Sequence, residues 1–393
     1  MRLTKEQSQL LHLTGVSLFH NRILTSIPEE ILCEARNQTV LPLIYQAERE
    51  PSGRWMRIVD RIFENNIRVD YEHTEVHKLL SANHIPYVIL KGSASASYYH
   101  EPMFRTMGDV DFLVYPDDLE QAGKVLESAG FQAAENDKGG LHIAYHRAPN
   151  SIWEMHQKPN GIPSGEAGEL ISGYLSDVIE SAVPYETQDG IILMPSRFHH
   201  GLILLLHTVS HLICEGVGLR HLCDWAVFVE SMSEQEFTDL FEEKLKACGL
   251  WRFAQILTLC CVEYLECPKK GWEGEAEPEL LQDMICDILR GGNFGQKDAD
   301  RYRQIKYISN RGTKTVDEKS AIQQVWNTIE EKAKQEQKSR LIVMTDYFRM
   351  VLRGERKPDS KSTLNQAEER KRIYAEFHLF EPDCRKFGEE NVK

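Results

Sequence analysis

The 393-residue chain is 41% hydrophobic, enough for the core of one large domain or of two to three ordinary ones, so we expect a globular protein. Its 46 Lys and Arg against 60 Asp and Glu give a net charge of −14, which disfavours non-specific binding to nucleic acid. Nine scattered cysteines without a C-x-x-C pair and a start unlike a secretory signal predict free thiols in a reducing cytoplasm.

The first part of the chain, residues 1–84, has apolar residues at three- and four-residue spacing, which predicts an N-terminal helical segment. The period changes at the β-prone run YVIL, residues 87–90, which is followed by Gly92-Ser93 and an Ala/Ser-rich stretch. A second strand, DVDFLVY, leads into a helix, DDLEQAGKVLESAG. We therefore expect two consecutive strand–helix units.

Two further short strands, LHIAYHR and SIWEMHQ, are expected to extend the sheet, because a turn at residues 148–150 separates them. From residue 191 to 265 the pattern is helical again, and its most apolar stretch, GLILLLHTVSHLI, is too short to span a bilayer. Residues 266–280 look like a linker, and the rest of the chain to residue 393 is charged helix with apolar patches such as LIVMTDYFRMVL.

These patterns predict an α+β fold in which a small mixed sheet is flanked by helices and followed by a mainly α-helical C-terminal region. The expected divisions are residues 1–84, a sheet-containing core at 85–190, a helical domain at 191–265 and a charged helical region at 266–393.

The second strand begins with two aspartates, Asp109 and Asp111. Side chains at i and i+2 of a strand point to the same face, so the two carboxylates converge and repel each other unless a cation lies between them. Mg²⁺ is commonly bound by one or two carboxylates together with substrate phosphates, whereas two solvated aspartates at a strand entry are the simpler alternative. The nearby Gly92-Ser93 turn favours the metal, because free N–H groups before a helix can hold a phosphate, and metal-assisted nucleotidyl transfer needs both features.

Three short motifs carry a family resemblance: LKG at residues 90–92, RTMGDVDFLV at 105–114 and WEMH at 153–156. In these motifs the chain resembles a bacterial family known as uncharacterised nucleotidyltransferases, a branch of the DNA polymerase beta-like nucleotidyltransferase superfamily. The resemblance covers about residues 85–160 and continues more loosely through GLRHLCDWAVFV, at 218–229. It implies a nucleotidyltransferase-like catalytic core in which Glu154 is the third carboxylate, as a base or a metal ligand. A Glu on a solvent-facing strand edge is the alternative for Glu154.

The predicted activity is the transfer of a nucleoside monophosphate from an NTP to an unidentified acceptor, with release of pyrophosphate, and Mg²⁺ or Mn²⁺ as cofactor. Asp109 and Asp111 would hold one metal, and a second would be shared with Glu154. Nucleotide-binding residues are expected at the turn and at the two cations beside it, although single cations near a turn are most often solvated: Lys91, Gly92, Ser93 and Arg105.

The sequence does not identify the acceptor, but the negative net charge of the chain favours a small molecule or a protein over long RNA. The alternative function is a catalytically idle nucleotidyltransferase fold that binds a nucleotide or a partner. A helical scaffold with a purely structural sheet would leave the aspartates unexplained.

Two i,i+4 pairs lie in the helical region. His207 and His211 share a helix face and could bind a metal, but no third ligand is evident and hydrogen bonding within the fold is the simpler expectation. Arg220 and Asp224 are expected to form a structural salt bridge.

Overall fold

The computed structural model describes residues 2–20, 24–51, 53–134, 142–298 and 361–381, together with the single positions 301 and 304. By their internal contacts the residues form two compact units, Met1–Asp298 with Ile373–Lys393, and Ala299–Arg372. The sheet and the candidate site belong to the first unit. The apolar patch LIVMTDYFRMVL lies outside the described residues, as does most of the predicted charged C-terminal region.

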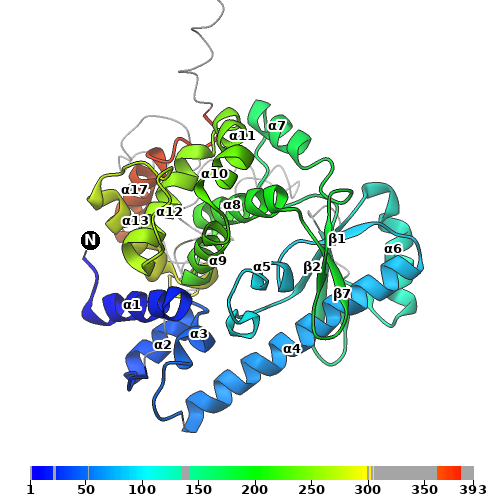
Figure 1. Ribbon diagram of the computed structural model, residues 1–393, viewed down its shortest axis with the longest axis horizontal. Helices are drawn as coiled ribbons and strands as arrows, with labels where there is room; N and C mark the ends of the chain where they lie inside the picture. The colour runs from blue at the N-terminus through cyan, green and yellow to red at the C-terminus, as the bar shows by residue number, and fades with distance from the viewer. Residues whose placement is uncertain are drawn as a thin grey trace, which may run out of the picture. The chain divides into compact units, whose positions relative to one another are not determined.

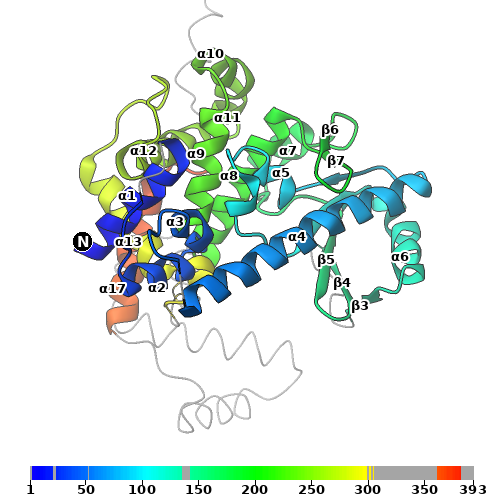
Figure 2. The same cartoon turned by 60° about the horizontal axis from the view of Figure 1, so that its bottom comes forward.

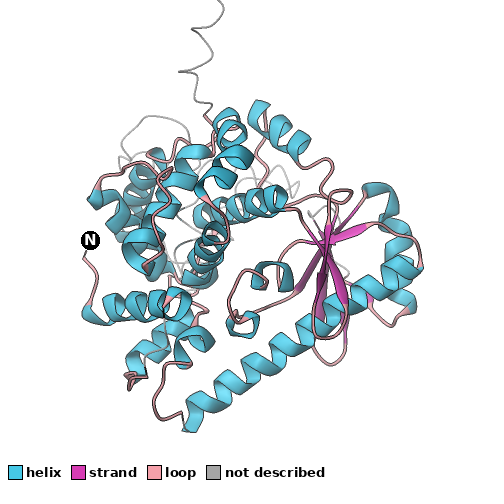
Figure 3. Ribbon diagram, in the orientation of Figure 1, coloured by secondary structure: helices cyan, strands magenta, loops and turns pink. Residues whose placement is uncertain are grey.

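A five-stranded mixed sheet with the order β1-β2-β5-β4-β3 forms one part of this unit (Figures 1 and 3). Its strands are β1 (Tyr87–Ile89), β2 (Val110–Val114), β3 (Gln132–Ala133), β4 (His142–Arg147) and β5 (Ser151–His156). The β2–β5 pair is parallel, and the other neighbouring pairs are antiparallel. The predicted α+β class and the four predicted strands of the small mixed sheet are therefore confirmed.

The period-two pattern of β2 separates a core face from a site face. Val110, Phe112 and Val114 belong to the hydrophobic core under the sheet, whereas Asp111 between them points to the opposite face. Burial of the apolar face stabilises the strand and so fixes where the carboxylate points.

Two helices cover the core face of the sheet. The thirty-residue α4 (Gly53–Ala82) contributes Val69, Val76 and Leu80 to this core, and α6 (Leu119–Ser128) contributes Ala122 and Leu126. Figures 1 and 2 both show α4 running along the sheet beside α6. The hairpin of β6 (Val183–Glu186) and β7 (Ile191–Met194) packs against α4 and β1.

A helical body forms the rest of the unit. Its longer helices are α1 (Lys5–Phe19), α2 (Glu29–Asn37), α7 (Glu166–Tyr174), α8 (Arg197–Cys214), α9 (Leu219–Glu230), α12 (Trp251–Leu265) and α13 (Pro278–Gly291). Shorter ones are α3 (Leu41–Tyr45), α5 (Ser93–Ala96), α10 (Glu234–Phe237) and α11 (Glu243–Ala247). The helix α17 (Lys361–Ala375) belongs mostly to the second unit. The helix α9 packs between α8 and α12, and α1 packs on α12. None of the described helices is both long and apolar enough to cross a membrane.

The stretch expected to be a linker packs against the helical body instead. Trp272 stacks on Phe237 with ring centroids 3.9 Å apart and an interplanar angle of 7°. Cys267 and Glu273 are buried, and α13 begins at Pro278. The segment connects α12 to α13 without a helix or strand of its own up to residue 277, but its Gly, Pro and charged residues did not indicate that it would pack closely through Trp272.

Candidate functional site

Three carboxylates meet at the end of the parallel strand pair. The β2–β5 register places Asp111 directly opposite Glu154, and Asp109 precedes β2 on the same face. Asp109, Asp111 and Glu154 each offer an oxygen, and the three oxygens lie within 4.8 Å of one another. Asp109 is exposed, Glu154 is half-buried and Asp111 is buried. An all-oxygen donor set of this kind fits a hard divalent cation such as Mg²⁺.

The two aspartates have different electrostatic surroundings. Repulsion from Asp111 raises the pKa of Asp109 to about 6, and although the residue as a whole is exposed, the enclosed position of its carboxyl group in the cavity wall contributes further. Burial alone would raise the pKa of Asp111, but the ammonium of Lys91 and the imidazole of His156 outweigh it and lower this pKa. Lys91 Nζ lies 3.0 Å from Asp111 Oδ2, and His156 Nε2 lies 3.0 Å from Asp111 Oδ1. Asp111 is therefore stabilised as a carboxylate without a metal, and Asp109 is not.

A cavity of about 330 Å³ contains the three carboxylates in its wall. The sheet side of this cavity is lined by Lys91, Gly92, Gly108, Asp109, Asp111, His142 and Glu154. The opposite side comes from α8, α9 and the short turn η4 (Asn293–Gly295), and its residues include His207, His211, Arg220, His221 and Phe294. This volume is at the lower end of the range for small-molecule sites.

Gly92 and Ser93 of the predicted turn face different ways. Gly92 lines the cavity with φ +60°, and a Cβ at this position would lie 2.3 Å from the ring of His73. The Ser93 hydroxyl instead donates to Asp70 Oδ1 at 2.7 Å and contacts His73 Nδ1 at 2.8 Å, both on α4. The Ser93 side chain thus faces α4 and is absent from the described lining of the acid cavity, where it was expected. The helix α5 after the turn is only four residues long.

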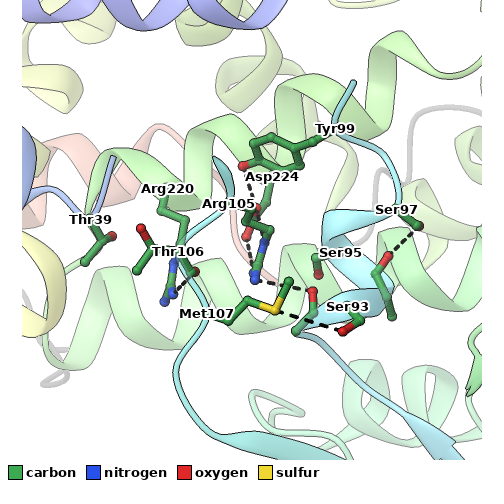
Figure 4. A network of polar contacts seen from close by, with 12 residues as sticks. Thr39, Ser93, Ser95, Ser97, Tyr99, Arg105, Thr106, Met107, Arg220 and Asp224 are labelled. Atoms are coloured by element: carbon green, nitrogen blue, oxygen red, sulfur yellow. Dashed lines mark hydrogen bonds and ion pairs between the residues drawn. The ribbon is translucent and has the colours of Figure 1, made fainter. Parts of the chain in front are cut away.

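The guanidinium of Arg105 forms a buried ion pair. Its Nε donates to Asp224 Oδ1 at 2.7 Å, and its Nη2 donates to Asp224 Oδ2 at 2.8 Å. Tyr99 donates to the same carboxylate at 2.7 Å (Figure 4). Both ionic partners are almost fully buried. Arg105 therefore joins the loop before β2 to α9. Because Asp224 already neutralises its guanidinium, we do not expect Arg105 to bind a triphosphate. The predicted Arg220–Asp224 salt bridge is wrong, because Arg105 takes the place of Arg220.

Arg220 is a residue that sequence reasoning did not place in the site. It lines the cavity, and its Nη1 donates to the Thr106 carbonyl at 2.9 Å (Figure 4). Within the described parts of the chain, no carboxylate lies within ion-pair distance of Arg220. Its guanidinium is thus a half-buried cation outside any direct ion pair among the described residues, with the carboxylates of Asp224 and Asp109 acting on it from a longer distance. The one available signal was its place in GLRHLCDWAVFV, the stretch through which the family resemblance continues more loosely.

The histidines of α8 contact each other without forming a metal site. The rings of His207 and His211 lie 4.2 Å apart at 75°, and His207 is stacked on His221 at 5.3 Å and 23°. Where side chains are described, the groups of three residues that could hold a metal are Asp109–Asp111–Glu154 and His142–Glu154–His156. Both groups share Glu154, and neither includes His207 or His211.

Comparison with known proteins is consistent with this geometry. A family model described as uncharacterised nucleotidyltransferase matches residues 27–266. Among solved structures, the chain has some similarity to an antigenic nucleotidyltransferase-like protein from Paracoccidioides brasiliensis, at 15% identity over 52% of this chain and 93% of that one. The TM-score of that pair is 0.29, which is too low to support an assignment. No curated protein matches the chain.

Proposed function

The chain belongs to the uncharacterised nucleotidyltransferase family, and from this premise we propose that it transfers a nucleoside monophosphate from an NTP to an acceptor nucleophile, releasing pyrophosphate, with Mg²⁺ or Mn²⁺ as cofactor. The observation that carries the proposal is the convergence of Asp109, Asp111 and Glu154 in one cavity wall. Lys91 and His156 offset part of the negative charge, but three carboxylates that approach each other so closely still repel one another, and a bound cation would remove that repulsion.

The three carboxylates of the site are proposed to bind the metal and to activate the acceptor. Asp109, Asp111 and Glu154 would hold the divalent cation, which when bound supplies positive charge for the triphosphate and the leaving pyrophosphate. Glu154, the half-buried member, is open to the cavity and is placed to orient the acceptor nucleophile or accept its proton. Its position opposite Asp111 in the strand register supports this role.

Two cations are available for the phosphates. Lys91 Nζ contacts Asp111 in the absence of substrate and lines the same cavity. Arg220 has no carboxylate partner among the described residues, and a guanidinium can hold phosphate oxygens through two parallel hydrogen bonds. We therefore assign the triphosphate to Lys91 and Arg220, in place of the Lys91 and Arg105 pair that the sequence suggested.

One observation favours the alternative, a catalytically idle fold that binds nucleotide. Both oxygens of Asp111 are already engaged by Lys91 and His156, so part of the acid cluster is neutralised without a metal. An idle protein would bind an NTP through the same cations but would release no pyrophosphate. Pyrophosphate release therefore separates the two functions.

The test incubates the full chain with Mg²⁺ or Mn²⁺, each of the four NTPs labelled at the α-phosphate, and fractionated cell extract as the acceptor source. We expect label in an acceptor and release of pyrophosphate, both abolished by Asp109→Asn. The matched control is Asp117→Asn, the same substitution at an exposed aspartate just beyond the far end of β2, which should retain transfer. Nucleotide binding without transfer in any fraction would support the idle fold, and equal activity in the two variants would contradict the assignment of the metal site.

A further inference from the structure

The cavity wall opposite the carboxylates includes several flat, neutral rings beside Arg220. His207 on α8 is stacked on His221 of α9, and Phe294 lies at the edge of the same wall with 43% of its surface exposed. Burial lowers the pKa of His207 and His221 well below the usual histidine value, so both imidazoles are neutral at pH 7. A wall of this kind suits a planar, uncharged group.

Two side chains with unused hydrogen-bonding atoms also line this cavity. His221 is only 4% exposed, and in the described structure neither of its ring nitrogens has a well-aligned hydrogen-bond partner, although the Gly218 backbone lies close enough to oppose part of the lowering of its pKa. The Oδ1 atom of Asn160 is also buried without a partner there, and Asn160 lines the same cavity. Buried polar atoms are nearly always hydrogen-bonded in folded proteins, so two such groups in one cavity indicate a missing polar ligand.

Apart from Arg220, which is assigned to the phosphates, the charged groups on this wall have partners of their own. The Glu215 carboxylate pairs with His211 Nδ1 at 2.9 Å, and Asp224 is held by Arg105. A neutral imidazole offers one donor and one acceptor, and an amide oxygen adds another acceptor. The side chains of His221 and Asn160 can therefore recognise the edge of a heterocycle with mixed donors and acceptors.

We infer that the wall formed by His207, His221, Phe294 and Asn160 holds the heterocyclic base of the NTP, and that His221 and Asn160 select which base is accepted. This inference rests on the proposed function, which places a metal and a triphosphate at the carboxylates. It goes further by naming the subsite for the base and the residues that would read it.

The sequence of α9 connects this subsite to the phosphate subsite. Arg220 and His221 are consecutive in the first turn of the helix, and both line the cavity. A ligand that binds Arg220 with its phosphates and His221 with its base spans from the acid cluster to the ring wall as one molecule. A separate acceptor molecule would not need its subsite to adjoin the phosphate subsite. The base of the NTP therefore fits the subsite beside His221 better than an acceptor does.

The test compares the binding of the Mg²⁺ complexes of ATP, GTP, CTP and UTP with that of Mg²⁺–tripolyphosphate, which has the phosphates but no base. We expect the wild type to bind at least one NTP about tenfold more tightly than tripolyphosphate. His221→Phe, which keeps a flat ring and removes both nitrogens, should reduce the affinity for that NTP about tenfold and leave tripolyphosphate binding unchanged.

Two further variants keep the test decisive. Phe294→Ala alters an exposed ring, so it should fold normally and weaken NTP binding alone. His200→Phe is the matched control, because His200 is equally buried with one unpartnered ring nitrogen but does not line the cavity, and it should retain the affinities of the wild type.

The outcomes separate this inference from the proposed function. Equal weakening of NTP and tripolyphosphate by His221→Phe and Phe294→Ala, or no preference of the wild type for any NTP over tripolyphosphate, would overturn the base subsite alone. Selective NTP binding that Asp109→Asn does not impair, with no pyrophosphate release, would support the subsite and overturn the proposed chemistry. Failure of every NTP and of tripolyphosphate to bind would overturn both.

Discussion

Asp109 and Asp111 are two positions apart, yet the fold treats them as different groups. Asp111 is buried between Lys91 and His156, whereas Asp109 is exposed and its pKa is raised to about 6 by its neighbour. A carboxyl group whose pKa rises on folding opposes folding when it is ionised, and one whose pKa falls supports it. The two aspartates should therefore respond in opposite ways to neutralisation.

We predict that Asp109→Asn keeps or raises the melting temperature of the metal-free protein at pH 7, because it removes the repulsion with Asp111. Asp111→Asn should lower the free energy of unfolding by about 1–3 kcal/mol, because it leaves Lys91 and His156 without their shared partner. Both variants should lose nucleotide transfer. Thermal and denaturant unfolding without metal measure the difference, and equal destabilisation by the two substitutions would refute this account of the pair.

The turn before α5 requires a residue without a Cβ atom. Gly92 has φ +60°, and a Cβ there would lie 2.3 Å from His73, whereas a Cβ at Gly108 would meet nothing within 4 Å. We predict that Gly92→Ala lowers the free energy of unfolding by more than about 1 kcal/mol. Gly108→Ala is the control for stability and should leave it unchanged. Similar unfolding curves for the two alanine variants would mean that the His73 side chain can move away from the new Cβ without lowering the free energy of unfolding.

Individual residues show how far sequence reasoning reaches. The alternation in DVDFLVY and SIWEM predicted the strands and the faces of Asp109, Asp111 and Glu154, because a two-residue period is a local property. The partner of Arg105 is 119 positions away, so no local spacing could reveal it, and the i,i+4 rule suggested Arg220 instead. The orientation of Ser93 depends on Asp70 and His73, which lie on a helix packed from another part of the chain.

At the scale of elements, one buried ion pair joins the sheet to the helical body. Arg105, in the loop before β2, holds Asp224 of α9 through two hydrogen bonds, and the same helix presents Arg220 and His221 to the cavity. The pair therefore positions the ring wall relative to the carboxylates.

We predict that Asp224→Asn lowers the free energy of unfolding by about 3–5 kcal/mol, because it leaves the buried guanidinium of Arg105 without its counter-ion. The double change Arg105→Met with Asp224→Leu should cost less than the sum of its two single changes, since it removes both charges. Chemical denaturation measures both effects. Glu120→Gln, which breaks the exposed pair with Lys124, is the control and should leave the unfolding midpoint unchanged. An additive double mutant would show that the two residues do not act as a pair.

At the scale of the whole molecule, the cavity needs both the sheet and the helices, so a ligand that fills it should stabilise them together. We predict that saturating Mg²⁺ and the preferred NTP raise the melting temperature at pH 7.5, by an amount that corresponds to about 2.7 kcal/mol at one hundred times the dissociation constant. The increase should shrink below about pH 6, because Asp109 then carries a proton that metal binding must displace. Asp109→Asn should abolish the increase and Asp117→Asn should retain it. An increase that persists unchanged at pH 5 would show that Asp109 does not bind the metal.

The parallel pairing of β2 with β5 also affects when the acid site can form during synthesis and folding. Asp111 and Glu154 are about forty positions apart, so their meeting closes a long loop that contains α6, β3 and β4. During synthesis, Asp109 and Asp111 leave the ribosome well before their third partner, and a nascent chain that ends before β5 has no complete acid site. Contacts between distant residues form slowly, so competence to bind metal should appear late in folding, after the local helices have formed.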